Sequence, residues 1–349
     1  MKGLVIFSAM LLGGACSAQV QLGQVDDFNS GHVHNWIGAP DPYGPFPVAN
    51  AGPNGSGDGA CRVRGSGSFG PGGHWAMYNT FQWAGNWIGA GVTVISADFR
   101  VFSGSPLDMR VVFFGQDGSR FTSTNDVMVP IPADNQYHRA YFFVTSQYVV
   151  NVLGEETYEQ VLGNASSFMF RHDPGDPDSR GSEVVSSAYV DNIKASDHVP
   201  VQPISVSVLE GEEFSGNLQS LISSDDDRLE IFNDPTTLAG EIMLTGFSPL
   251  AVPGALHFDA EAMVARPGLA QGISFRNFVT SAKQVVGGST ASTSDVLSQI
   301  VITSNPARFV QATTKRMEAY LAWSPINDED PSQDGWLQST DWIQWRIYP

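Results

Sequence analysis

Basic residues are scarce in this chain. Its 349 residues include 18 lysines and arginines against 36 aspartates and glutamates, which gives a formal net charge of −18. A nucleic-acid backbone and an anionic membrane surface both attract basic faces, so this balance argues against either partner. We therefore expect no nucleic-acid ligand.

Cysteines and long apolar runs are also scarce. The two cysteines are Cys16 and Cys61, and no segment approaches the roughly 18 unbroken apolar residues that a membrane-spanning helix needs. If the chain is cleaved after Ala18, Cys61 remains alone and cannot form an internal disulfide. We expect Cys61 to be a half-buried small residue, and the alternatives are an intermolecular disulfide bridge or a reactive nucleophile. We expect no membrane span.

The first 18 residues have the pattern of a signal peptide. Lys2 precedes an apolar run over residues 4–15, and small residues follow before Gln19. We therefore expect export, either into the medium or to the cell surface. A lipid anchor at Cys16 is the second alternative, because the residues before it lack the leucine usual three positions earlier.

Glycine and proline are abundant, with 36 and 21 copies, and they separate short strand-like runs. Alternation of apolar and polar residues, as over residues 96–101, is typical of strands with one buried face. One short helix is predicted, at residues 155–162, and the Gly-, Pro- and Asn-rich stretch 41–73 is predicted to be loop. Regularly spaced strands with few helices predict an all-β protein of antiparallel β-sandwiches.

Two domains are expected after the signal peptide at 1–18. The first covers residues 19–199, residues 200–203 form a proline-containing linker, and the second domain covers residues 204–349. Residues 19–199 carry 9 basic and 18 acidic side chains, a net charge of −9, and residues 200–349 carry 8 and 18, a net charge of −10. Neither domain therefore offers an overall basic docking surface.

Both ends of the first domain carry recognisable motifs. Residues 25–31 read Val-Asp-Asp-Phe-Asn-Ser-Gly, Trp36 follows, and residues 189–193 read Tyr-Val-Asp-Asn-Ile. Together they resemble the jelly-roll modules of exported bacterial proteins, related in form to concanavalin-like and carbohydrate-binding modules. This resemblance covers most of residues 24–195. Residues 204–349 resemble an uncharacterised module of exported bacterial surface proteins, through motifs such as Glu-Glu-Phe-Ser-Gly-Asn-Leu at 212–218.

The first resemblance implies a structural calcium ion between the first and last strands. The matching carboxylates are Asp27, or its neighbour Asp26, and Asp191. Calcium prefers such oxygen ligands together with main-chain carbonyls. The alternative is that these acids only accept hydrogen bonds from turn amides. Residues 225–227, three consecutive aspartates, lack the spacing of an EF-hand loop.

Aromatic residues with neighbouring amides suggest a sugar-binding platform. Sugar rings stack on tryptophan, while amides bind hydroxyl groups. The candidate ligand-binding residues are Trp75, Trp83, Trp87, Asn79, Gln82 and Asn86. The alternative is that the three tryptophans belong to the core. Core positions are predicted for Trp36, Phe81 and Trp345.

No complete catalytic constellation occurs. His32, His34 and His74 lack the spacing of a zinc-enzyme motif, and no Gly-x-Ser-x-Gly elbow is present. The Glu-x-Asp-x-x-Glu strand of concanavalin-like hydrolases is also missing. We expect a non-catalytic protein, although carboxylates that cannot be paired from sequence leave the enzyme class open.

The function expected from the sequence is exported binding or display. The first domain would recognise a polysaccharide or other surface glycan weakly, with calcium as a structural ion. The second would be a scaffold or a protein-contact domain. Two alternatives remain: a structural envelope or matrix component, and an extracellular glycan-active enzyme.

Overall fold

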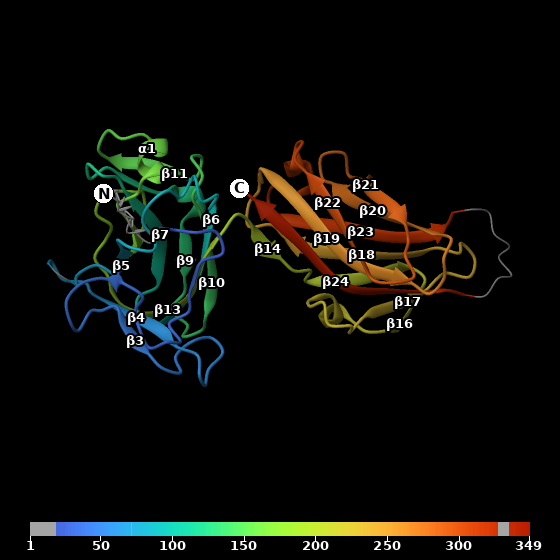
Figure 1. Cartoon of the computed structure of the whole chain (residues 1–349), viewed down its shortest axis with the longest axis horizontal. Coiled ribbons are helices and arrows are strands. Elements are labelled where there is room, and N and C mark those ends of the chain that lie inside the picture. Colours follow the sequence, from blue (N-terminus) through green and yellow to red (C-terminus); the bar gives the residue numbers. More distant parts are fainter. Residues whose placement is uncertain (1–18, 71, 327–334) are drawn as a thin grey trace, which may run out of the picture. The chain divides into compact units, whose positions relative to one another are not determined.

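The computed structural model describes residues 19–70, 72–326 and 335–349. Along the chain, the boundary between its two compact units falls after Ala195. In both units β-strands are by far the main regular element (Figure 1). The predicted signal peptide lies outside the described residues. The predicted linker at 200–203 is not a free spacer, because Val199–Val201 forms strand β14 and pairs with β24 (Leu337–Tyr348).

Two antiparallel sheets make up the first unit. Sheet 1 has the order β10-β6-β13-β4-β3, with β1 beside β13, and sheet 2 has the order β11-β8-β7-β12-β5-β2, with β9 beside β7. The strands of sheet 1 are β1 (Val25–Asp26), β3 (Phe46–Val48), β4 (Ala60–Ser66), β6 (Val94–Gly104), β10 (His138–Phe143) and β13 (Val185–Ser196). Those of sheet 2 are β2 (Trp36–Ile37), β5 (Ala76–Asn79), β7 (Leu107–Phe114), β8 (Arg120–Ser123), β9 (Val129–Ile131), β11 (Val149–Leu153) and β12 (Ser167–His172).

Alternation along the strands forms the core between these sheets. In β6, Ile95, Ala97 and Phe99 are fully buried and face sheet 2, while the residues between them face the other side of sheet 1. The Phe99 ring lies 5.6 Å from the ring of Phe170 on β12. The first unit is therefore a β-sandwich, as predicted.

The second unit is another antiparallel sandwich. Sheet 3 has the order β16-β17-β24-β19-β22, with β14 beside β24, and sheet 4 has the order β15-β18-β23-β20-β21. The remaining strands are β15 (Ser205–Glu210), β16 (Glu212–Ser215), β17 (Leu229–Phe232), β18 (Gly240–Phe247), β19 (Ala255–Val264), β20 (Leu269–Asn277), β21 (Ala282–Thr290), β22 (Val296–Ile302) and β23 (Arg316–Pro325). Phe258 of β19 and Phe275 of β20 meet in its core, with ring centroids 5.4 Å apart.

Helices are short and local. The one α-helix among the described residues, α1 (Tyr158–Gly163), starts three residues after the predicted start at 155, because Thr157 caps it reciprocally with Gln160. Three 3₁₀ turns complete the described structure: η1 (Asn125–Val127), η2 (Leu218–Leu221) and η3 (Pro306–Phe309).

The predicted loop at 41–73 is only partly loop. It contains β3 and β4, and β4 lies between β3 and β13 in sheet 1. Glycine and proline dominate its flanks, but Cys61 and Val63 alternate with Arg62 and Arg64, which is a strand pattern. No helix among the described residues is long and apolar enough to cross a membrane.

Candidate functional site

The three tryptophans predicted to stack on sugar are core residues. Trp75, Trp83 and Trp87 are 0% exposed. The rings of Trp83 and Trp87 lie 5.8 and 5.1 Å from Phe168, inside the sandwich. A covered ring offers no face to a ligand, so the predicted platform is wrong at these positions, and their alternative core assignment is correct.

A buried carboxylate holds two of the core tryptophans in place. Asp26 accepts hydrogen bonds of 2.7 Å from the Nε1 atoms of both Trp36 and Trp83. Trp36 is buried as predicted, as is Trp345 in the second unit, whereas Phe81 is 48% exposed and not a core residue. The polar sequence around Trp83 therefore reflects its buried N–H partner rather than exposure of its ring.

The predicted amides brace the loop that carries these tryptophans. The buried Asn79 accepts hydrogen bonds from the main-chain amides of Phe81 and Trp83, and Gln82 donates to Asp26. Asn86 is exposed and accepts a hydrogen bond from the Gly89 amide at 2.7 Å. Asn79 and Gln82 thus have structural partners, and the structure does not gather the six candidate residues around an open cleft.

Asp191 is the most unusual carboxylate of the first unit. It is 0% exposed, and neither carboxylate oxygen has a hydrogen-bond partner in the described parts of the chain. Burial, followed by the charges of Asp58, Asp98 and Asp27, raises the pKa of Asp191 to about 7. An unpaired buried charge is costly, so such a group usually has a cation beside it or takes up a proton.

Main-chain strain accompanies both predicted calcium ligands. Phe28, which follows Asp27, has a φ of 53°, and Asn192, which follows Asp191, has a φ of 49°. Positive φ is rare for a bulky residue such as phenylalanine, and strain of this kind is concentrated at functional sites. Asp27 itself accepts a hydrogen bond from the Asn29 amide at 3.2 Å, as the turn alternative expected.

Asp27 and Asp191 fit calcium only if main-chain oxygens also serve as ligands. Across residues 19–70, 72–326 and 335–349, no group of three or more His, Cys, Asp or Glu side chains could hold a metal ion. Calcium also accepts main-chain carbonyls and water as ligands. The unpartnered Asp191 carboxylate beside other acids therefore fits a hard cation, provided that carbonyl oxygens complete the ligand set.

A second feature, which sequence reasoning missed, is the side of sheet 1 that faces away from the core. We call this surface the outer face; it carries Phe46, Arg62, Arg64, Asp98, Arg100, Phe102, Arg139, Tyr141, Tyr189 and Asn192. The rings of Phe102 and Tyr189 stack on it with centroids 4.5 Å apart and an interplanar angle of 26°. Both rings are only half-buried, so they form an aromatic patch within a polar surface.

Polar groups surround this ring pair. Arg100 lies 5.7 Å over the Tyr189 ring, and Asp98 accepts hydrogen bonds of 2.7 Å from Arg139 and 2.9 Å from Asn192. On the neighbouring strand β4, the Nε atoms of two arginines, Arg62 and Arg64, are buried without a hydrogen-bond partner. Hydrogen-bond donors thus stand beside aromatic rings, which is the combination that polar ring-shaped ligands need.

The sequence did contain a signal for this surface. Asp98 and Arg100 alternate with apolar positions in the strand pattern predicted at 96–101, and Phe102 continues this alternation one residue beyond it in β6. Such alternation indicates a solvated face, and an aromatic residue on it is the informative exception. Assigning β4 to a loop concealed the two arginines that extend the surface.

The other candidates from the sequence do not assemble. His32 is exposed, and His34 contacts Ser30 at 3.2 Å rather than another histidine. Cys61 is fully buried, more deeply than predicted, and burial raises the pKa of its thiol well above the usual value. Among residues 225–227, the first two donate main-chain hydrogen bonds to Asp341.

No protein-family model and no curated protein matches this sequence. Among solved structures, an exo-β-agarase has 12% sequence identity and a TM-score of 0.35, over 50% of this chain and 25% of the agarase. A family 11 carbohydrate-binding module from Clostridium thermocellum, in complex with a β-1,3-1,4-mixed-linked tetrasaccharide, has 16% identity and a TM-score of 0.34. That match covers 50% of this chain and 96% of the module.

Proposed function

We propose that the first unit binds carbohydrate on the outer face of sheet 1. The observation that carries this proposal is the half-buried Phe102–Tyr189 ring pair, set among arginine, asparagine and aspartate side chains. Aromatic rings contact the C–H faces of a sugar, and the charged and amide groups bind its hydroxyls. The buried Trp75, Trp83 and Trp87 would support this surface from the core.

Arg139 already pairs with Asp98, and Arg100 donates to Asn135, whereas the two arginines of β4 have no such partner where the structure describes the chain. Arg62 lies over the Phe46 ring at 5.3 Å, and neither it nor Arg64 has a side-chain hydrogen-bond acceptor among the described residues. Asp98 is buried and already accepts hydrogen bonds from Arg139 and Asn192, so it holds these two side chains in place on the outer face. A polyhydroxylated ligand would complete these interactions on one surface.

Calcium would stabilise the edge of this surface. Asp191 and Asp27 would supply carboxylate ligands, together with main-chain carbonyls of the strained segments that contain Phe28 and Asn192. Asn192 also donates a hydrogen bond to Asp98 on the outer face, so the ion would fix a residue that contacts the binding surface. Its role would be structural, because it neutralises the buried Asp191 charge.

The binding proposal is tested by titrating neutral polysaccharides into the wild-type chain and into Tyr189→Ala. Loss of one aromatic contact should weaken binding about tenfold, corresponding to roughly 1.4 kcal/mol. Phe81→Ala is the matched control, since Phe81 is an exposed ring of the same unit outside the outer face. Equal losses in both variants, or no binding by the wild type, would contradict the assignment.

Export and a non-catalytic role belong to the same proposal. The residue pattern of positions 1–18 supports export, and the motifs found in the sequence support no reaction class. Release of reducing ends from any polysaccharide that binds would instead favour the alternative of a glycan-active enzyme.

A second candidate function is protein contact through the second unit. Strands β21 and β22 are edge strands of sheets 4 and 3, and each has only one neighbour among the described strands. They expose Val285 by 75%, Val301 by 59% and Val296 by 48%. Open strand edges with exposed valines favour pairing with another chain, as in a structural component. Sedimentation of the wild type and Val285→Lys over a range of concentrations tests this function.

A further inference from the structure

Basic residues of the second unit are concentrated in one stretch, although the unit as a whole is acidic. Of the 8 basic residues in 200–349, six fall within residues 262–317, whereas only one of the 18 acidic residues does. The six are Arg266, Arg276, Lys283, Arg308, Lys315 and Arg316. The one acidic residue, Asp295, is engaged by Arg228. This stretch therefore carries local positive charge that the net charge of −10 conceals.

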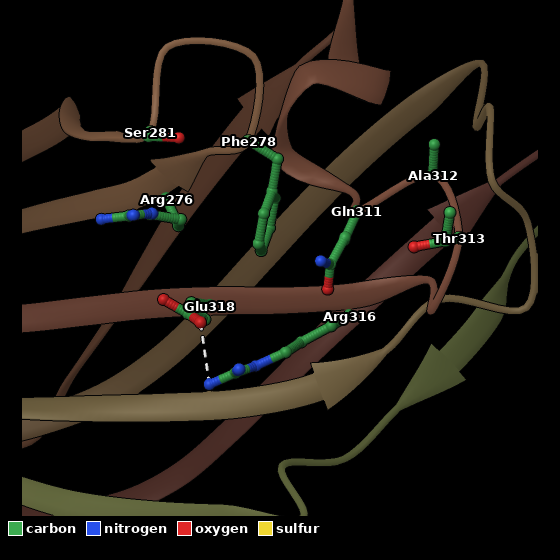
Figure 2. A pocket seen from close by; sticks show the side chains of 8 residues that line it. All are labelled: Arg276, Phe278, Ser281, Gln311, Ala312, Thr313, Arg316 and Glu318. Carbon is green, nitrogen blue, oxygen red and sulfur yellow. Dashed lines mark ion pairs between the residues drawn. The ribbon is translucent and has the colours of Figure 1, made fainter.

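A pocket of about 610 Å³ opens within this stretch. Its lining includes Arg276 of β20, Phe278, Gln311 and Thr313 from the adjoining loops, and Arg316 and Glu318 of β23. Figure 2 shows the Phe278 ring and the Gln311 side chain reaching toward the Arg316–Glu318 ion pair. The volume lies in the range of small-molecule sites.

The one acidic side chain that lines the pocket is already neutralised. Glu318 forms a 2.8 Å ion pair with Arg316 and accepts a 2.7 Å hydrogen bond from the Tyr320 hydroxyl. Its side chain is 11% exposed. Glu318 therefore repels an anion only weakly. Two guanidinium groups against one carboxylate leave the lining with a net positive charge.

Donors outnumber free acceptors in this lining. In the described parts of the chain, Arg276 has no ion-pair or hydrogen-bond partner, and the Nε atom of Arg316 has no acceptor. Gln311 uses its amide oxygen to accept from the Thr314 hydroxyl, which leaves its NH₂ group as a donor. A ligand that matches this set brings anionic oxygens, and arginine binds carboxylate and similar oxyanions with two parallel hydrogen bonds.

We propose that this pocket binds an anionic sugar, with Arg276 on its carboxylate or sulfate group. Phe278 would contact the apolar side of the sugar ring, and Gln311 and Thr313 would bind its hydroxyls. This site lies in the second unit and requires a charged ligand, so it is independent of the neutral-glycan surface proposed for the first unit.

Calorimetric titration of the full chain with trigalacturonate, galactose 6-sulfate and neutral galactotriose tests the proposal. Arg276→Gln should weaken binding of the anionic sugars about tenfold, the effect of one charged hydrogen bond. The matched control is Lys283→Gln, because Lys283 lies opposite Arg276 in the sheet register but bonds Glu241 at 2.6 Å. This control should leave binding unchanged, and the two anionic ligands distinguish a carboxylate from a sulfate preference.

Several results would overturn the proposal. The wild type could fail to bind either anionic sugar, or Arg276→Gln and Lys283→Gln could lose the same affinity, which would indicate diffuse electrostatic attraction. Gln311→Ala changes an uncharged residue of the same pocket and should also weaken binding. This second variant keeps the proposal testable if the arginine variant misfolds. Loss of trigalacturonate binding in Tyr189→Ala would place the ligand on the first unit and contradict the pocket.

Discussion

Asp191→Asn should stabilise the metal-free protein at neutral pH, although it removes a residue predicted to bind calcium. The substitution keeps the size of the side chain and removes its charge. In the fold the pKa of Asp191 is about 7, against an ordinary value of 3.8. The difference, 7 − 3.8 = 3.2, corresponds to about 4 kcal/mol at roughly 1.4 kcal/mol for each pH unit.

The pH dependence follows from proton binding. Between about pH 4 and pH 7, folded Asp191 holds a proton that the unfolded chain has released, so stability falls as pH rises through this window. Above pH 7 the full free-energy cost of burying the ionised Asp191 carboxylate is present. Without metal, the free energy of unfolding of Asp191→Asn should therefore exceed that of the wild type by up to about 4 kcal/mol at pH 8. This difference should disappear near pH 4.

Calcium should reduce this difference in stability. A ligand at 100 times its dissociation constant adds about 2.7 kcal/mol to the folded state, and Asp191→Asn should gain almost none of it. Urea unfolding in chelator and in calcium, followed by hydrogen exchange in peptides of β13, measures both effects. Asp126→Asn, which removes an exposed acid of the same unit, is the control. The reasoning would be refuted if the difference in stability between the wild type and Asp191→Asn neither varied with pH nor responded to calcium.

Three further predictions concern the first unit. Trp83→Ala should lower the free energy of unfolding by about 3–5 kcal/mol in a denaturant titration, because it empties a fully buried site and leaves Asp26 with one donor fewer; a loss below 1 kcal/mol would contradict its core role. Arg110→Met should make residues 173–182 more sensitive to proteolysis, since buried Arg110 donates to the carbonyls of Asp173 and Gly175; an unchanged cleavage rate would show that the loop does not depend on it. Cys61 should react with a thiol reagent only in denaturant, because the thiol is fully buried and its pKa is raised; rapid modification of the folded chain would contradict this burial.

Strand positions were the most predictable part of the fold. The alternating residues at 96–101, which predicted a strand, lie within β6. In both sandwiches one face of each inner strand must be apolar, so the alternation of apolar and polar residues identifies the strand from sequence. Strand β4 was missed because flanking glycines and prolines outweighed a short alternating pattern, and β21 because its exposed edge position leaves its apolar residues unburied.

The candidate site was predictable only in part. Asp191 was found through the motif at the end of the first unit, and its burial explains why a carboxylate there needs a partner. Trp83 and Trp87 were assigned to a surface because their neighbours are polar. The direction of a ring that follows a turn depends on tertiary packing, here against Phe168, and local sequence does not encode it.

Tyr189 shows the opposite case. It lies between Ala188 and Val190, both fully buried, so its outward direction follows from the strand period alone. Its pairing with Phe102 depends on β13 lying beside β6, a neighbour relation between segments about 90 residues apart. Sequence alternation can thus place single residues on a face, whereas assembly of the face requires the topology.

Hydrogen exchange of the full chain with and without a bound neutral oligosaccharide tests the central claim most directly. If the outer face is the binding surface, the ligand should slow exchange in peptides of β4, β6 and β13, which carry Arg62, Phe102 and Tyr189. Protection confined to the loop around residues 79–89, or to the second unit, would contradict that assignment.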